Sequence, residues 1–80
     1  MKVEIITPKG IELEREAIRI VLPTLMGEIT VLPHHVPLIS VLKAGKIRIA
    51  TEKEEEIEKE IEGGILEVVD NKAVILLKKF

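Results

Sequence analysis

Two adjacent histidines between two prolines are the residues of this 80-residue chain that most directly suggest chemistry. His34 and His35 could supply imidazole ligands to a metal ion such as zinc. Neighbouring side chains on an extended chain point to opposite sides, however, so the two rings would not readily share one ion. Pro33 and Pro37 cannot donate to a β ladder, and each restricts the residue before it. We therefore expect a rigid, exposed loop here and no metal site.

Other candidate motifs predict structural roles. Residues 44–47, Ala-Gly-Lys-Ile, lack two features of a phosphate-binding loop, because Ser40 stands where its first glycine belongs and Ile47 where Ser or Thr belongs. A turn between strands is expected there. Gly63 and Gly64 lack the strand-to-helix context of a nucleotide fingerprint, which favours a bulge or close packing. No spacing predicts a Ser-His-acid triad. We expect no catalytic residue and no cofactor.

The composition argues against further classes of function. The formal net charge is −2, and the charges of both signs are interspersed, so there is no basic stripe for nucleic acid. One Phe and no Trp or Tyr leave no platform for stacking bases. The absence of cysteine excludes disulfides and thiolate chemistry, and the first residues lack the apolar core of a signal peptide. The Lys, Glu and Ile bias is typical both of thermophile proteins and of idealised engineered sequences.

The hydrophobic pattern predicts strands. Apolar residues make up 46% of the chain and are mainly Ile, Val and Leu, which suit β structure. Short apolar runs are separated by turn signals at intervals typical of sandwiches and barrels. We expect strands at residues 3–7, 11–14, 17–22, 29–32, 38–42, 46–51, 65–69 and 73–77.

These strands would form one all-β domain over residues 1–80, because a chain this short has no room for a second domain. The predicted architecture is a small β-sandwich of two antiparallel sheets around an aliphatic core. The expected core residues are Ile5, Ile18, Ile20, Val31, Val41, Ile49, Leu66, Val68 and Ile75.

Residues 52–62, EKEEEIEKEIE, are ambiguous. Their composition favours a helix, with Ile57 and Ile61 four positions apart on one face. The same two residues and Lys59 would also share one face of a strand. A strand this charged must have a solvated face or lie at a sheet edge, where charges discourage unwanted pairing.

Two spaced motifs resemble those of one family. The first is Gly27-Glu28, then the mainly apolar residues 29–32, then Pro33-His34-His35-Val36-Pro37-Leu38. The second is residues 63–68, Gly-Gly-Ile-Leu-Glu-Val. Together they resemble the amino-terminal domain of the ATP synthase epsilon subunit, called delta in mitochondria, over residues 1 to about 77. The resemblance favours a strand for residues 52–62.

The resemblance implies a non-catalytic component of the central stalk, with the gamma subunit and the membrane-embedded c-ring as partners. It would lie peripherally on the cytoplasmic face of an energy-transducing membrane, with no insertion into it. The residues that match the family's ring-facing motif are Glu28, Pro33, His35, Pro37 and Leu38. The strand that follows the loop is our choice for gamma contacts, through Ile39, Val41 and Leu42.

Several departures from the family pattern keep two other hypotheses open. Leu25, Met26, Thr30 and His34 differ from the residues usual at their positions. The family's carboxy-terminal helical hairpin is also absent from the 80 residues, so its regulatory roles are not expected here. An engineered or idealised scaffold could keep the fold without the partners. An unrelated small β-barrel could instead bind peptides or self-associate through an exposed strand edge.

Overall fold

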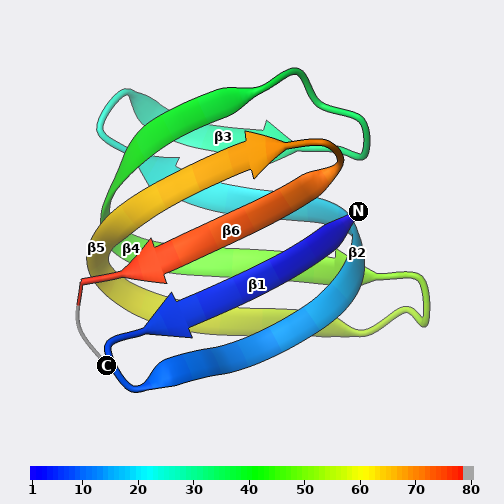
Figure 1. Cartoon of the computed structure of the whole chain (residues 1–80), viewed down its shortest axis with the longest axis horizontal. Coiled ribbons are helices and arrows are strands. Elements are labelled where there is room, and N and C mark those ends of the chain that lie inside the picture. The colour runs from blue at the N-terminus through cyan, green and yellow to red at the C-terminus, as the bar shows by residue number, and fades with distance from the viewer. Residues whose placement is uncertain (79–80) are drawn as a thin grey trace.

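The computed structural model describes residues 1–78, and every regular element in that range is a β-strand (Figure 1). The prediction of an all-β fold is confirmed. The six strands are β1 (Lys2–Thr7), β2 (Gly10–Thr24), β3 (Gly27–Val31), β4 (Leu38–Thr51), β5 (Glu56–Val69) and β6 (Lys72–Leu77).

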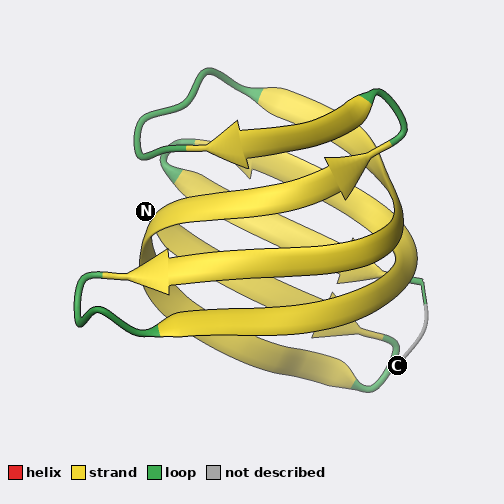
Figure 2. Ribbon diagram, turned by 180° about the vertical axis from the view of Figure 1, so that it is seen from behind, coloured by secondary structure: helices red, strands yellow, loops and turns green. Residues whose placement is uncertain are grey.

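The strands form one continuous sheet that curls around the core (Figure 2). Their order is β1-β6-β5-β4-β2-β3, and an additional pairing of β1 with β2 closes a ring. Residues 10–16 of β2 pair with β1, while its later residues pair with β3 and β4. The prediction was two separate antiparallel sheets. The structure instead has one continuous sheet, and β1 pairs with β6 in parallel.

Three of the strands are longer than predicted, because the chain continues through positions that look like breaks. Residues 43–46 lie within β4, so the predicted turn at Ala44-Gly45 is wrong. Val21 pairs with Arg48 and Thr24 with Leu42, so five residues of β4 stand opposite two of β2. One of those two is Pro23, which has no N–H to donate to a ladder. A bulge in β4 therefore replaces the turn.

These irregularities explain two errors in the predicted core. All its members are at most 1% exposed except Ile18, at 41%, and Val41, at 51%. A register shift beside Ile18 lets Ala17 and Ile20 both face inward, so Ile18 faces solvent. In β4 the even-numbered residues face inward before the bulge and the odd-numbered residues face inward after it. Val41 lies before the bulge and therefore faces solvent.

Gly64 marks the corresponding irregularity in β5. The buried positions change there from Ile61 and Gly63 to Leu66 and Val68. A Cβ atom on Gly64 would overlap the backbone carbonyl oxygen of Leu76 on β6. Close packing, one of the two predicted reasons for the glycine pair, is therefore confirmed at Gly64.

The charged segment forms a strand from Glu56 onward, while residues 52–55 form a turn. In that turn the Thr51 N–H donates to the Glu55 carbonyl oxygen at 2.9 Å. β6 pairs with β5 only from Gly64, so within the described residues the outer edge of residues 56–63 has no strand partner. Charges on that edge protect it from unwanted pairing. Lys59 in this segment also forms an ion pair with Glu12 of β2.

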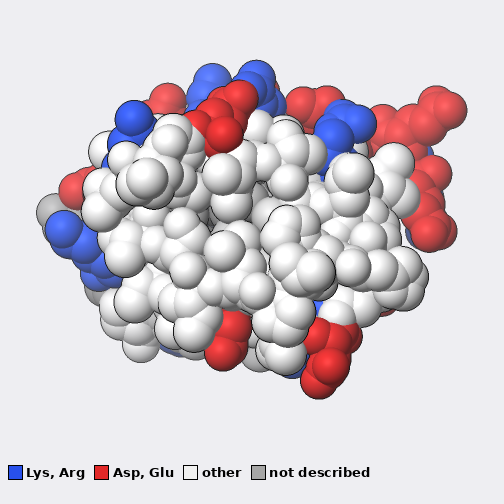
Figure 3. All heavy atoms as spheres, turned by 90° about the horizontal axis from the view of Figure 1, so that it is seen from above, with Lys and Arg blue, Asp and Glu red and all other residues white. Residues whose placement is uncertain are grey.

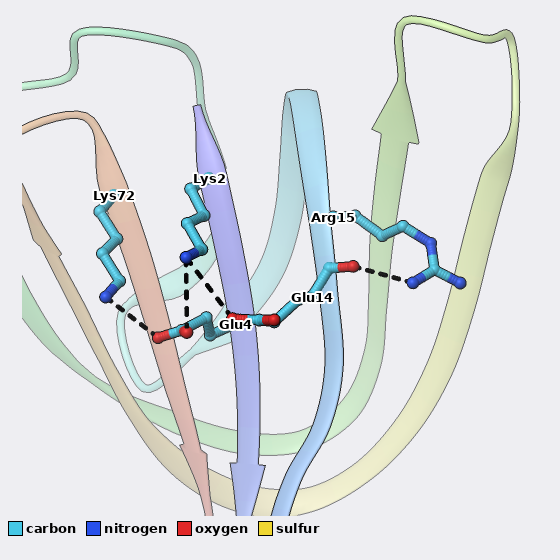
Figure 4. A network of polar contacts seen from close by, with 5 residues as sticks. All are labelled: Lys2, Glu4, Glu14, Arg15 and Lys72. Atoms are coloured by element: carbon cyan, nitrogen blue, oxygen red, sulfur yellow. Dashed lines mark hydrogen bonds and ion pairs between the residues drawn. The ribbon is translucent and has the colours of Figure 1, made fainter.

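A charged cluster lies where β1 joins its two neighbours (Figure 4). Glu4 of β1 is 8% exposed and stands opposite Glu14 of β2. Its carboxylate lies 3.2 Å from the Lys72 ammonium and 3.9 Å from the Lys2 ammonium, which is also 3.5 Å from Glu14. Hydrogen bonds with Glu14 and then with Lys72 are the main causes that lower the pKa of Glu4.

Replacing Gly64 with Ala should destabilise the fold. The new methyl group must displace the backbone of β6, so we expect the free energy of unfolding to fall by about 1–3 kcal/mol. Urea denaturation followed by circular dichroism measures this. Glu60→Ala, at an exposed position of the same strand, should change stability by less than about 0.5 kcal/mol. Equal stabilities of wild type and Gly64→Ala would contradict the packing described here.

Glu4 should make stability depend on pH in the acid range. Because the fold lowers the pKa of Glu4, the charged form of its side chain stabilises the fold at pH values above the pKa that Glu4 has in the unfolded chain. This contribution is lost as the pH falls through the folded pKa. The stability gap between wild type and Glu4→Gln should therefore shrink when urea denaturation is repeated from pH 7 towards pH 3. Glu60→Gln controls for the lost charge, and a gap that is constant or grows towards acid would refute this role.

Candidate functional site

The ring-facing residues predicted from the sequence lie on β3 and on the loop of residues 32–37 that follows it, except Leu38, which begins β4. Both segments are at the top of the molecule in Figure 1. Glu28 is the second residue of β3, with its side chain 62% exposed, and His35 lies in the loop, half-buried. Pro33 is half-buried and Pro37 is exposed. All four are placed at the surface of one end of the sandwich.

The loop is held by hydrogen bonds within it and by one bond to Asn71 in the turn between β5 and β6. The backbone N–H of His35 donates to the Leu32 carbonyl oxygen at 3.2 Å. Its ring Nδ1 lies 2.7 Å from the Val36 carbonyl oxygen, which it reaches as a donor in the Nδ1-protonated tautomer. The backbone N–H of His34 donates to Oδ1 of Asn71 at 2.8 Å, from a left-handed conformation with φ 66°. The loop therefore presents His35 in a defined conformation.

A tight turn and a neighbouring cation hold Glu28 at the surface. The Thr24 hydroxyl donates to the Gly27 carbonyl oxygen at 2.6 Å and accepts from the Met26 N–H at 3.1 Å. The Glu28 carboxylate lies 3.4 Å from Nη2 of Arg48 on β4. Sequence analysis missed Arg48, because this pair forms only when β2 places β3 and β4 on its two sides.

Glu28 and His35 do not form one compact site. Glu28 lies near the start of β3, and His35 lies in the loop beyond its end. The strand residues between them, 29–31, span roughly 10 Å at about 3.3 Å per residue. Together they mark the length of an extended surface. Within the described residues no three His, Asp or Glu side chains are grouped so as to hold a metal ion. Nor do residues 1–78 contain a helix long and apolar enough to span a membrane.

The residues chosen for gamma contacts divide between surface and core. Ile39 is 72% exposed and Val41 is 51% exposed, because both point outward from β4. Leu42 is only 3% exposed, so its side chain belongs to the core and cannot contact a partner. Leu38, predicted to contact the ring, is half-buried and packs against the core.

The outward residues of β4 continue into an apolar row on the neighbouring strands. Val41 pairs with Ile65 of β5, which pairs with Leu76 of β6. Ile65 and Leu76 are each 45% exposed. We call Ile39, Val41, Ile65 and Leu76 the apolar row. Seen from above, the molecule shows a broad face almost without charge, with acidic and basic side chains around its rim (Figure 3).

Comparison with known proteins identifies the family. Residues 1–80 match the model of the ATP synthase delta/epsilon chain, β-sandwich domain. The chain belongs to this family. The epsilon-type motifs found in the sequence thus occur in a chain with the family's fold.

Curated relatives are ATP synthase epsilon chains. That of Brevibacillus brevis is 37% identical over 76 residues, which cover 95% of this chain and 58% of that protein. That of Chlorobium limicola is 36% identical over 94% of this chain and 85% of its own length. That of Desulfitobacterium hafniense is 45% identical over 90% of this chain and 54% of its own. This chain thus spans little more than half of some relatives. The relationship gives no support to the engineered-scaffold hypothesis.

Solved structures share the fold. A chain in the Euglena gracilis mitochondrial ATP synthase structure, described as OSCP/F1/c-ring, superposes with a TM-score of 0.87 and 23% identity. The match covers 94% of this chain and 48% of that one. A chain in the Tetrahymena thermophila central stalk and c-ring has a TM-score of 0.80 and 23% identity, over 96% and 62% of the two chains.

Proposed function

We propose that this epsilon-family domain is a non-catalytic component of the central stalk of a rotary ATP synthase. It docks on the gamma subunit and on the c-ring and couples the two, so that they rotate as one body. It lies peripherally on the cytoplasmic face of the energy-transducing membrane. The observation that carries the proposal is the match of all 80 residues to the delta/epsilon β-sandwich domain, since relatives over this span are epsilon chains.

The ring contact uses β3 and the following loop. Glu28 and His35 carry it, and Pro33, Pro37 and Leu38 keep the backbone between β3 and β4 in place. Hydrogen bonds within the loop and two fixed proline φ angles reduce the conformational entropy lost on docking. The contact is extended rather than a pocket, which suits a partner that offers a row of polar loops.

Arg48 sets the charge of this surface near Glu28. An exposed ion pair contributes little to stability, because solvent screens it. Its proposed importance is for recognition, since the Glu28 carboxylate is already partly neutralised and remains able to accept hydrogen bonds. Polar groups on the ring can then bind it without supplying a matching cation.

The gamma contact uses the apolar row. Ile39 and Val41, chosen from the sequence, are joined there by Ile65 and Leu76 across three paired strands. Contiguous exposed aliphatic side chains on a sheet are typical of protein interfaces. Leu42 is not part of this contact, because it is buried. Different parts of the outer surface of one sheet thus serve the two partners.

The ring contact can be tested by calorimetric titration into a purified gamma and c-ring assembly that lacks epsilon. Wild type should bind saturably at a ratio of one to one. Glu28→Lys combined with His35→Ala should weaken binding by roughly tenfold or more, about 1.4 kcal/mol, through charge reversal and loss of the imidazole. Circular dichroism should show an unchanged fold.

Glu52→Lys with Ile11→Ala is the matched control, since it combines the same charge reversal with a truncation to alanine at exposed positions outside β3 and the loop. It should bind almost as wild type. Equal binding by both double variants would show that Glu28 and His35 are not part of the interface. No binding by folded wild type would overturn the proposed function.

The gamma contact can be tested with isolated gamma subunit. Val41→Glu places a charge in the middle of the apolar row and should weaken binding by roughly tenfold, because the carboxylate must be desolvated. Ile11→Glu is the control, since Ile11 is 60% exposed on β2, outside the row. Surface plasmon resonance compares the two. Similar affinities of Val41→Glu and Ile11→Glu for gamma would show that the gamma contact does not include the apolar row.

A further inference from the structure

Asn71 connects the proposed ring-facing loop to the rest of the fold. Its Oδ1 accepts a hydrogen bond from the His34 backbone N–H at 2.8 Å, across 37 residues of sequence. We infer that Asn71 is a positioning residue, which holds the loop in the orientation that presents His35 to the partner. The inference rests on the proposed function for the identity of that partner.

The turn between β5 and β6 fixes the Asn71 side chain. Val69 and Lys72 pair across it, and the two residues between them, Asp70 and Asn71, have φ of 51° and 59°. Two successive left-handed residues are the mark of a tight hairpin turn, which favours Asn, Asp and Gly. Asparagine satisfies this backbone requirement and also offers a side-chain acceptor.

Asn71 is itself anchored to a third segment. Its carbonyl oxygen accepts from the Lys2 N–H at 3.2 Å, at the start of β1. Lys2 also pairs with Lys72 in the parallel ladder between β1 and β6. The acceptor for His34 therefore belongs to the part of the sheet where the ring of strands closes, and its position is set by backbone pairing.

The loop needs such an anchor. The hydrogen bonds of His35, to Leu32 and Val36, stay within the loop, so they shape it without attaching it to the framework. His34 adopts a left-handed conformation that is uncommon for residues other than glycine. The bond to Asn71 stabilises this conformation, and it determines how the next residue, His35, is directed.

The test separates the side-chain acceptor from the turn. Asn71→Gly keeps a residue suited to positive φ but removes Oδ1, whereas Asn71→Asp keeps both properties. Amide hydrogen exchange at His34, measured by NMR on the free protein, reports the bond directly. It should become roughly tenfold faster in Asn71→Gly and return close to the wild-type rate in Asn71→Asp.

Binding to the c-ring assembly should follow the exchange rates. Asn71→Gly should bind several-fold more weakly, with an unchanged circular dichroism spectrum, and Asn71→Asp should restore affinity. Unchanged His34 exchange in Asn71→Gly would overturn the anchor. Faster exchange with unchanged ring affinity would overturn the positioning role. Failure of wild type itself to bind would overturn the proposed function, while the exchange rates would still decide whether Asn71 anchors the loop.

Discussion

The pairing of β1 with two partners is the constraint on which the rest of this structure depends. β1 lies parallel to β6 on one edge and antiparallel to β2 on the other, and so closes the sheet around an aliphatic core. Closure demands curvature, which the chain achieves with a bulge in β4 and close packing at Gly64. At the junction Lys2 and Lys72 neutralise Glu4, which would otherwise be a nearly buried charge beside Glu14.

This closed sheet gives the domain its proposed role as a coupling element. The ring-facing loop is joined through Asn71 to the turn beside β1, and the apolar row is built on strands of the same sheet. In this proposal, forces applied at the loop pass to the apolar row through the hydrogen-bonded backbone of the sheet. Within the described residues, β6 pairs with β5 only from Gly64 onward, and the charged side chains of residues 56–62 limit pairing of that edge with other chains.

The sequence was a good guide to the strands and to most of the core, because alternating Ile, Val and Leu are a local signal. It failed at Ile18 and Val41, since a register shift or a bulge reverses the inward face and leaves no local mark. Glycine at position 45 suggested a turn, yet the strand continues past it. Motifs suggested Glu28 and His35 as contact residues, which stays a prediction, whereas Arg48, Asn71 and Ile65 gained their proposed roles only from strands brought together by the fold.

In the proposed complex, one end of the sandwich and the adjoining apolar row face the stalk and the ring. Hydrogen–deuterium exchange, compared between the free domain and its complex with a gamma and c-ring assembly, tests this arrangement most directly. We expect slower exchange on binding in β3, in residues 32–37 and in the paired strands that carry the apolar row, with no change in residues 52–55. Protection confined to residues 52–55 or to the turn between β1 and β2 would show that β3, the loop and the apolar row are not the contact surfaces.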